Sequence, residues 1–282
     1  MPGGPESGRV SLPPGSRLPD AEPSKRTAVE EEILALFLHF GETALLFSGS
    51  IRALFKRPIE FREIANQIQA IGVKSVPLGL ITGLFVGMVM ALQFALSLTQ
   101  FGGLEYTGRI IGLSFSRELA PTLTSTIVGS RIAAGIAAEL GSMAVTEQVD
   151  AIRALGADPI KKLVMPRLVA TTIAMPILCI VSFTVGMIGA MAVCDFQFSL
   201  PAGFFLSTAL DATFLADFWN GYLKTPIFGM IIALVGCHYG LNTRGGTQGV
   251  GRSTTQAVVV TSVSILLADF GLTNLYAFLI PK

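Results

Sequence analysis

The sequence predicts an all-α polytopic membrane protein with an N-terminal interfacial helix and five transmembrane helices. Hydrophobic residues make up 51% of the 282 residues and charged residues only 14%, whereas a soluble globular chain carries about 25% charge. The mean hydropathy of the chain is +0.64. Uncharged stretches recur along the chain, and each approaches the roughly 20 residues that a helix needs to cross a bilayer. These observations disfavour a water-soluble fold.

Charge and residue usage argue against several other classes of protein. The 20 Lys and Arg against 19 Asp and Glu leave a net charge of +1, so we expect no nucleic-acid partner. Cys179, Cys194 and Cys237 lie in apolar surroundings and form no C-x-x-C pair, which predicts neither a disulfide framework nor a zinc site. With only His39 and His238, and without H-E-x-x-H or G-x-S-x-G patterns, we expect no metal, no cofactor and no catalytic residues.

The N-terminal region differs from the rest of the chain. Residues 1–29 hold six of the fifteen prolines and lack an apolar segment after the early arginines, which predicts a disordered tail and not a signal peptide. We expect residues 30–72 to form interfacial and amphipathic helices. Within them, Ile33–Phe55 is apolar but contains His39, Glu42 and Arg52; we favour a helix in the interface, and a sixth span is the alternative.

An amphipathic helix and five spans follow. Apolar side chains at Phe61, Ile64, Ile68 and Ile71 recur at helical spacing, with polar residues between them. The transmembrane domain is expected over residues 73–282, with spans at roughly 75–98, 113–140, 165–193, 222–241 and 254–279. Basic residues concentrate before the first span, between the second and third, and between the fourth and fifth. The positive-inside rule then places the N-terminus in the cytoplasm and the C-terminus outside.

Small residues recur every four positions in two of the spans. The first span contains Gly79, Gly83, Gly87, Ala91 and Ala95, and the second contains Gly129, Ala133, Ala137 and Gly141. Small residues at this spacing allow helices in a membrane to approach closely. Two interpretations stay open: packing within the chain, or a dimer seam along one of the two stripes.

The second span carries charged residues, which are costly inside a bilayer. Arg117 and Glu118 lie near its outer end, and Pro121 should loosen the helix beside them. They predict either an ion pair with another helix, through Lys224 or Asp269, or a cavity that handles a polar or charged group. For Arg131 and Glu139, nearer the cytoplasmic end, packing or snorkelling is expected. Asp211 and Asp217 are expected to lie outside the bilayer in solvent.

The connection between the second and third spans reads V-T-E-Q-V-D-A-I-R-A-L-G-A-D-P. It predicts a short cytoplasmic helix over residues 146–156, with Thr146 as N-cap and Gly156 just past its end. A helix this short is marginal alone in water. It should therefore dock, either on its own membrane domain or in the groove of a partner.

Several long motifs resemble the MlaE (YrbE-like) permease family, over about residues 30–280. They are S-R-E-L-A-P, G-S-R-I-A-A-G-I-A-A-E-L-G-S-M, the V-T-E-Q-V-D-A-I-R-A-L-G-A-D-P connection, and C-H-Y-G-L-N-T-R-G-G-T-Q-G-V-G-R-S-T-T-Q-A-V-V. The resemblance implies a homodimeric permease in the bacterial inner membrane, with two cytoplasmic ATPase subunits and a periplasmic ring of lipid-binding MCE subunits. Such systems move phospholipids between the two membranes.

The resemblance also implies roles for particular residues. The short cytoplasmic helix matches the coupling helix that docks on the ATPase, through Glu147, Gln148, Asp150, Ile152, Arg153 and Leu155. Arg117 and Glu118 match polar residues near the family's lipid cavity, and Lys224 and Asp269 are placed near it. Depth in the membrane and the resemblance suggest four side chains for the apolar part of that cavity: Leu78, Ile81, Phe85 and Leu119.

The sequence thus predicts a permease subunit of an ATP-driven transporter that moves glycerophospholipids between inner and outer membranes. The alternative is an ion-coupled secondary transporter of an amphipathic solute, with Glu118 and Asp269 as its intramembrane carboxylates; a scaffold without transport is a third class. G-T-Q-G-V-G-R-S at residues 246–253 resembles a P-loop, but it connects two spans and is expected to be a basic cytoplasmic loop. Transport direction and headgroup preference stay open.

Overall fold

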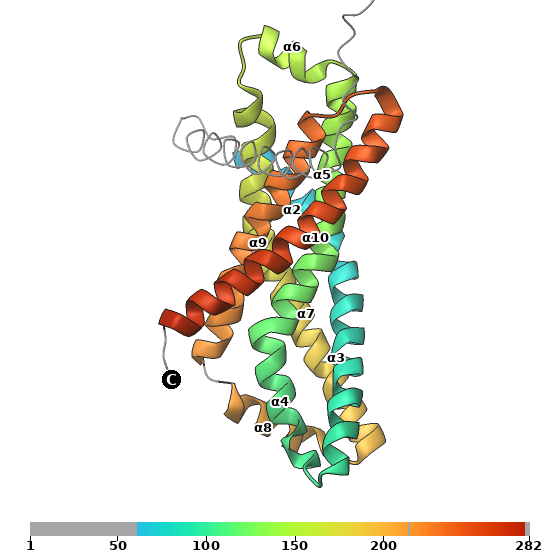
Figure 1. Cartoon of the computed structure of the whole chain (residues 1–282), viewed down its shortest axis with the longest axis vertical. Helices are drawn as coiled ribbons and strands as arrows, with labels where there is room; N and C mark the ends of the chain where they lie inside the picture. Colours follow the sequence, from blue (N-terminus) through green and yellow to red (C-terminus); the bar gives the residue numbers. More distant parts are fainter. Residues whose placement is uncertain (1–60, 214, 280–282) are drawn as a thin grey trace, which may run out of the picture. The chain divides into compact units, whose positions relative to one another are not determined.

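A computed structural model describes residues 61–213 and 215–279, and every regular element in these ranges is a helix (Figure 1). The predicted tail and the segment Ile33–Phe55 lie outside the described residues. The helices, in chain order, are α2 (Phe61–Ile71), α3 (Val76–Gln100), α4 (Thr107–Ser114), α5 (Ala120–Val145), α6 (Gln148–Ala154), α7 (Met165–Phe198), α8 (Ala202–Ala212), α9 (Leu215–Leu241) and α10 (Gly246–Leu279). Short 3-10 turns lie at Val73–Ser75 and Leu104–Tyr106, and π-turns lie at Phe115–Leu119 and Ile160–Val164.

Five helical segments are long and apolar enough to cross a membrane, which confirms the predicted all-α polytopic fold. They are Phe61–Gln100, Leu104–Val145, Ile160–Phe198, Asp217–Leu241 and Gly246–Phe278. Most extend beyond the predicted spans because the helices continue past the uncharged windows into flanking polar residues. The amphipathic α2 leads through one 3-10 turn into α3 and packs on α7, with Ile64 and Ile71 buried.

Both stripes of small residues serve packing within the chain. A Cβ atom on Gly83 would lie 2.3 Å from the carbonyl oxygen of Ser182, and one on Gly87 would lie 2.0 Å from that of Gly186. The backbones of α3 and α7 therefore touch directly. The second stripe faces α9 in the same way, since a Cβ on Gly129 would lie 2.5 Å from Ile232 Cδ1.

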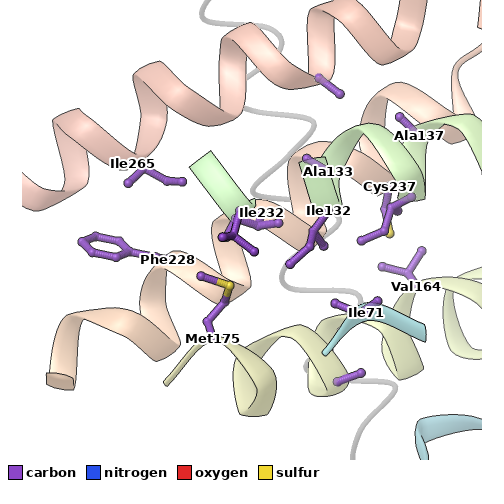
Figure 2. Packing of buried hydrophobic residues seen from close by; sticks show 14 of the residues in the cluster. Ile71, Ile132, Ala133, Ala137, Val164, Met175, Phe228, Ile232, Cys237 and Ile265 are labelled. Carbon is purple, nitrogen blue, oxygen red and sulfur yellow. The ribbon is translucent and has the colours of Figure 1, made fainter. Parts of the chain in front are cut away.

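The main hydrophobic cluster joins several helices and extends to α6 through Val149. Figure 2 shows side chains from α2, α5, α7, α9 and α10 meeting in this cluster, among them Met175, Phe228, Ile232 and Ile265. Helix α9 is the most enclosed of the five candidate spans: 72% of its 18-residue apolar stretch is buried. Helix α10 is the least enclosed, with 11% of the corresponding stretch buried. One face of α10 is consequently left open to lipid or to another chain.

The sequence did not predict α8, which occupies part of the connection between the third and fourth spans. It packs against α4 at two glycines: a Cβ on Gly108 would lie 2.6 Å from the carbonyl oxygen of Phe205, and one on Gly112 would lie 3.0 Å from Ala209. Burial of Phe205 and Ala209 against these glycines holds the short helix in place.

Candidate functional site

A π-turn at Phe115–Leu119 positions the two charged residues of the second span. Pro121 lies in the first turn of α5 directly after it. Because proline lacks an N–H and its ring crowds the preceding turn, the α-helical hydrogen-bond pattern is interrupted at this point. The predicted loosening is confirmed, and it takes the form of a wider helical turn that carries Arg117 and Glu118.

Glu118 belongs to an ion network that joins this turn to α9 and α10. The Lys224 ammonium donates hydrogen bonds to Glu118 Oε2 at 2.8 Å, to Asp269 Oδ1 at 3.2 Å and to Thr273 Oγ1 at 2.7 Å. The Thr273 hydroxyl in turn donates to Glu118 Oε1 at 3.1 Å. The Lys224 side chain is only 4% exposed, so its charge is stabilised by these partners and not by solvent.

Arg117 pairs with Asp217 of α9, and its Nε lies 2.8 Å from Asp217 Oδ1. The expectation that Asp217 is solvated was wrong, since its side chain is only 7% exposed. The reason is that α9 begins at Leu215, well before the predicted start at residue 222, and places Asp217 on a helix that faces the π-turn. Gly221 permits this approach: a Cβ there would lie 2.1 Å from the carbonyl oxygen of Ser116.

Five charged groups meet around this turn. Among the described residues, the two cations Arg117 and Lys224 pair with three carboxylates, those of Glu118, Asp217 and Asp269. Glu118 and Arg117 are the most exposed members of this network, at 38% and 35%. The predicted ion pairing of Glu118 with Lys224 is confirmed, and the adjacent opposite charges of Arg117 and Glu118 stay accessible from outside the network.

The apolar residues predicted beside this network occupy different environments. Leu78 and Leu119 are half-buried and pack against hydrophobic clusters. Ile81 and Phe85 are 56% and 58% exposed and lie on the face of α3 turned away from its contact with α7. A small cavity beside Leu119 measures about 10 Å³, which is the size of one water molecule. Because of their exposure, Ile81 and Phe85 are open on their outer side within one chain.

At the cytoplasmic connection the structure contains the short helix α6 (Gln148–Ala154), which is shorter than predicted. Thr146 is not its N-cap: its hydroxyl donates back to the carbonyl oxygen of Ser142 at 2.8 Å, as part of the end of α5. Glu147 takes the cap position with a left-handed φ of 60°. Gly156, with φ of +77°, ends the helix as predicted.

The two faces of α6 differ in their contacts. Val149 is buried and Ile152 is half-buried against the main cluster, so the helix docks on its own membrane domain. The opposite face is exposed and comprises Glu147, Gln148, Asp150, Arg153 and Leu155. Asp150 and Arg153 form an ion pair at 2.9 Å, and Leu155 is 86% exposed. This face is available to a partner.

Five helical segments long enough to span a membrane, three of them joined by an ion network, define a multi-pass membrane protein. Comparison with known proteins specifies the family: the family Permease MlaE matches residues 64–275. The chain therefore belongs to the MlaE permease family, whose relatives are named as permeases of ABC transporters. Residues 246–253 form the first turns of helix α10, so the expectation of a loop over these residues was wrong: the chain turns just before them, at residues 242–245. They follow helix α9 and not a strand, which agrees with the rejection of a P-loop.

The chain is similar to proteins from several lineages. It is 40% identical over 212 residues to a probable ABC transporter permease protein of Synechocystis, covering 75% of this chain and 81% of that one. A Rickettsia typhi protein with the same description is 37% identical over 235 residues, 83% of this chain and 91% of the relative. Arabidopsis thaliana Protein TRIGALACTOSYLDIACYLGLYCEROL 1, chloroplastic, is 39% identical over 223 residues; the match covers 79% of this chain and 64% of the plant protein, less than two thirds of its length.

Proposed function

We propose that the chain is the membrane subunit of an ATP-driven transporter that moves glycerophospholipids between the inner and outer bacterial membranes. The observation that carries this proposal is the ion network of Glu118, Lys224 and Asp269 inside otherwise apolar spans. Charges at this depth are costly unless they meet polar partners, and a lipid headgroup is such a partner. The name of the plant relative contains a glycerolipid, which is in line with this substrate class.

In this proposal the exposed pair Arg117 and Glu118 meets the headgroup, and Lys224 and Asp269 hold Glu118 in position. The acyl chains lie against Leu78, Ile81, Phe85 and Leu119. Because Ile81 and Phe85 are open on their outer side, a second copy of the chain would be needed to enclose them. The substrate cavity would then lie at the centre of a homodimer.

The proposal also assigns a partner subunit to each side of the membrane. A cytoplasmic ATPase subunit would dock on the exposed face of α6, and a periplasmic MCE-domain subunit would receive or deliver lipid at the opposite side. Residues 73–282 would form the permease domain in the inner membrane and residues 30–72 the interfacial segment that precedes it. The N-terminus would be cytoplasmic and the C-terminus periplasmic.

Photo-crosslinking in membranes tests the substrate site. A photoreactive residue at Leu119 or Phe85 should capture a phospholipid in an ATP-dependent manner when the ATPase subunit is present. The control positions are Ile177 and Ile180, which are exposed on α7 and should give the same adducts with or without ATP. Capture that is ATP-independent at all four positions would overturn the central cavity.

A further inference from the structure

A second, apolar cavity lies between α7 and α8, with Gly112 of α4 and Phe218 of α9 also in its wall and none of the charged residues of the ion network lining it. Its volume is about 570 Å³, within the range of about 300–1,000 Å³ typical of sites for small molecules. Three of its wall residues, Ile188, Leu206 and Leu210, are 53%, 45% and 66% exposed, so the cavity opens to the outside of the chain. Because α6 precedes α7 and α8 follows it, the cavity lies toward the end of α7 away from α6.

The side chains that line the cavity offer no free hydrogen-bond donor. Of the residues that line the cavity, only Thr184 and Thr213 have polar side chains. The Thr184 hydroxyl donates to the carbonyl oxygen of Ile180 at 2.9 Å, and the Thr213 hydroxyl donates to that of Ala209 at 2.8 Å. The two hydroxyl oxygens can still accept a hydrogen bond, but no charged side chain lines the cavity and the other ten lining residues are apolar or glycine. The lining therefore favours an apolar occupant.

The volume distinguishes between apolar occupants. An apolar cavity of about 150 Å³ binds benzene, which has six carbons, so 570 Å³ corresponds on the order of twenty carbons. A transmembrane helix is about 10–12 Å across, so only part of its face could enter a cavity of this volume. The cavity thus fits one acyl chain better than a helix of a partner protein. Met187 and Met191 in its wall can adapt to such a chain.

We propose that this cavity holds one acyl chain of a phospholipid from the surrounding bilayer, at a site distinct from the ion network. Three of the segments long and apolar enough to cross a membrane contribute to its walls, Leu104–Val145, Ile160–Phe198 and Asp217–Leu241, so its open side would meet lipid tails. The site needs only that the chain spans a bilayer, and it goes beyond the proposed transport. A lipid that leaves or enters the chain sideways at α8 would pass this position.

The test compares two positions on the same face of α7. Ile188 lines the cavity and Ile177 lies three turns away outside it, and both are similarly exposed, at 53% and 54%. A photoreactive residue is placed at each position in the full chain, which is purified in mild detergent, washed to remove loosely held lipid, irradiated and weighed by mass spectrometry. We expect a phospholipid adduct at Ile188 and no adduct at Ile177. Equal adducts at both positions, or none at Ile188, would overturn the proposal.

A second variant fills the cavity. Met187→Trp should abolish the adduct at Ile188, with Ile177→Trp as the matched control that leaves the adduct intact. If Met187→Trp lowers the yield of folded protein, Leu210→Trp replaces it, because Leu210 is 66% exposed at the mouth and tolerates a larger side chain. An adduct that survives in the folded filled variant would contradict the proposal. Glu118→Gln separates the two sites, since it should alter ATP-dependent capture at Leu119 and leave the adduct at Ile188 unchanged.

Discussion

The Arg167 guanidinium lies 2.7 Å from the Glu139 carboxylate and so joins the start of α7 to the cytoplasmic part of α5. Arg167 also donates to the carbonyl oxygen of Leu163, in the π-turn that follows the α6 connection, at 2.6 Å. The Arg167 side chain is 4% exposed, whereas Glu139 is 56% exposed. The two partners of this ion pair therefore have very different access to solvent.

This difference predicts that removing one partner or the other lowers the stability of the protein by different amounts. Glu139→Ala leaves a buried guanidinium without its carboxylate and should lower the free energy of unfolding by about 3 kcal/mol, the low end for breaking a buried pair. Arg167→Met keeps much of the volume and leaves Glu139 in contact with solvent, so we expect a smaller loss. Thermal unfolding in detergent checks the order; an equal or reversed order would show that the exposed carboxylate contributes little.

The contact between α3 and α7 predicts opposite effects for two glycines of the same stripe. Gly87→Ala should lower stability by at least about 2–3 kcal/mol, because its Cβ would lie 2.0 Å from the carbonyl oxygen of Gly186. Gly79→Ala meets nothing within 4 Å and should be neutral or stabilising, since alanine is the better helix former. Unfolding temperatures of the two variants, measured side by side, provide the comparison.

The pairing of Arg117 predicts a large difference between two nearby aspartates. Asp217→Ala removes the carboxylate from a pair whose acidic member is 7% exposed, and should reduce the yield of folded protein. Asp211→Ala changes an exposed residue of α8 and should have little effect. Size-exclusion profiles of both variants test this. A partial recovery in Arg117→Leu/Asp217→Ala would assign the effect to the unpaired arginine.

The exposed face of α6 predicts where the ATPase binds. Replacing Glu147 and Asp150 with lysine should detach or uncouple the ATPase, because both carboxylates lie on the exposed face and not in the docked one. Glu105→Lys, at an exposed residue far from α6 in the chain, is the matched control. Co-purification and the ATPase rate are the measurements, and unchanged values for both would contradict the docking site.

The proposed orientation predicts which of the short helices α6 and α8 a membrane-impermeant thiol reagent can reach. A cysteine at Asp211 should be labelled from outside, and one at Ala151 of α6 should not; both positions are exposed. The native thiols should give little background because Cys179, Cys194 and Cys237 are buried. Labelling of Ala151→Cys in intact cells would reverse the orientation.

The spans could be predicted from the sequence because uncharged windows leave few alternatives in a bilayer. Features that depend on distant partners could not. Asp217 is one hundred residues away from Arg117, and only the early start of α9 brings the two together. Helix α8 is eleven residues long, which is too short for a span, and its packing depends on Gly108 and Gly112 of another helix. Similarly, the stripes of small residues indicated close packing but could not name the helix they contact.

The π-turn at Phe115–Leu119 makes this span tolerant of the deletion of one residue. An i→i+5 turn accommodates about one residue more than an α-helical turn, so α4 and α5 keep the orientation of a straight helix that is one residue shorter. Deleting one residue inside this turn should leave α4 on α8 and α5 on α9. The same deletion in the middle of α5 would rotate one half of the span by about 100°. The adjacent opposite charges thus lie on the one segment of this span where chain length can change without moving the rest of the molecule.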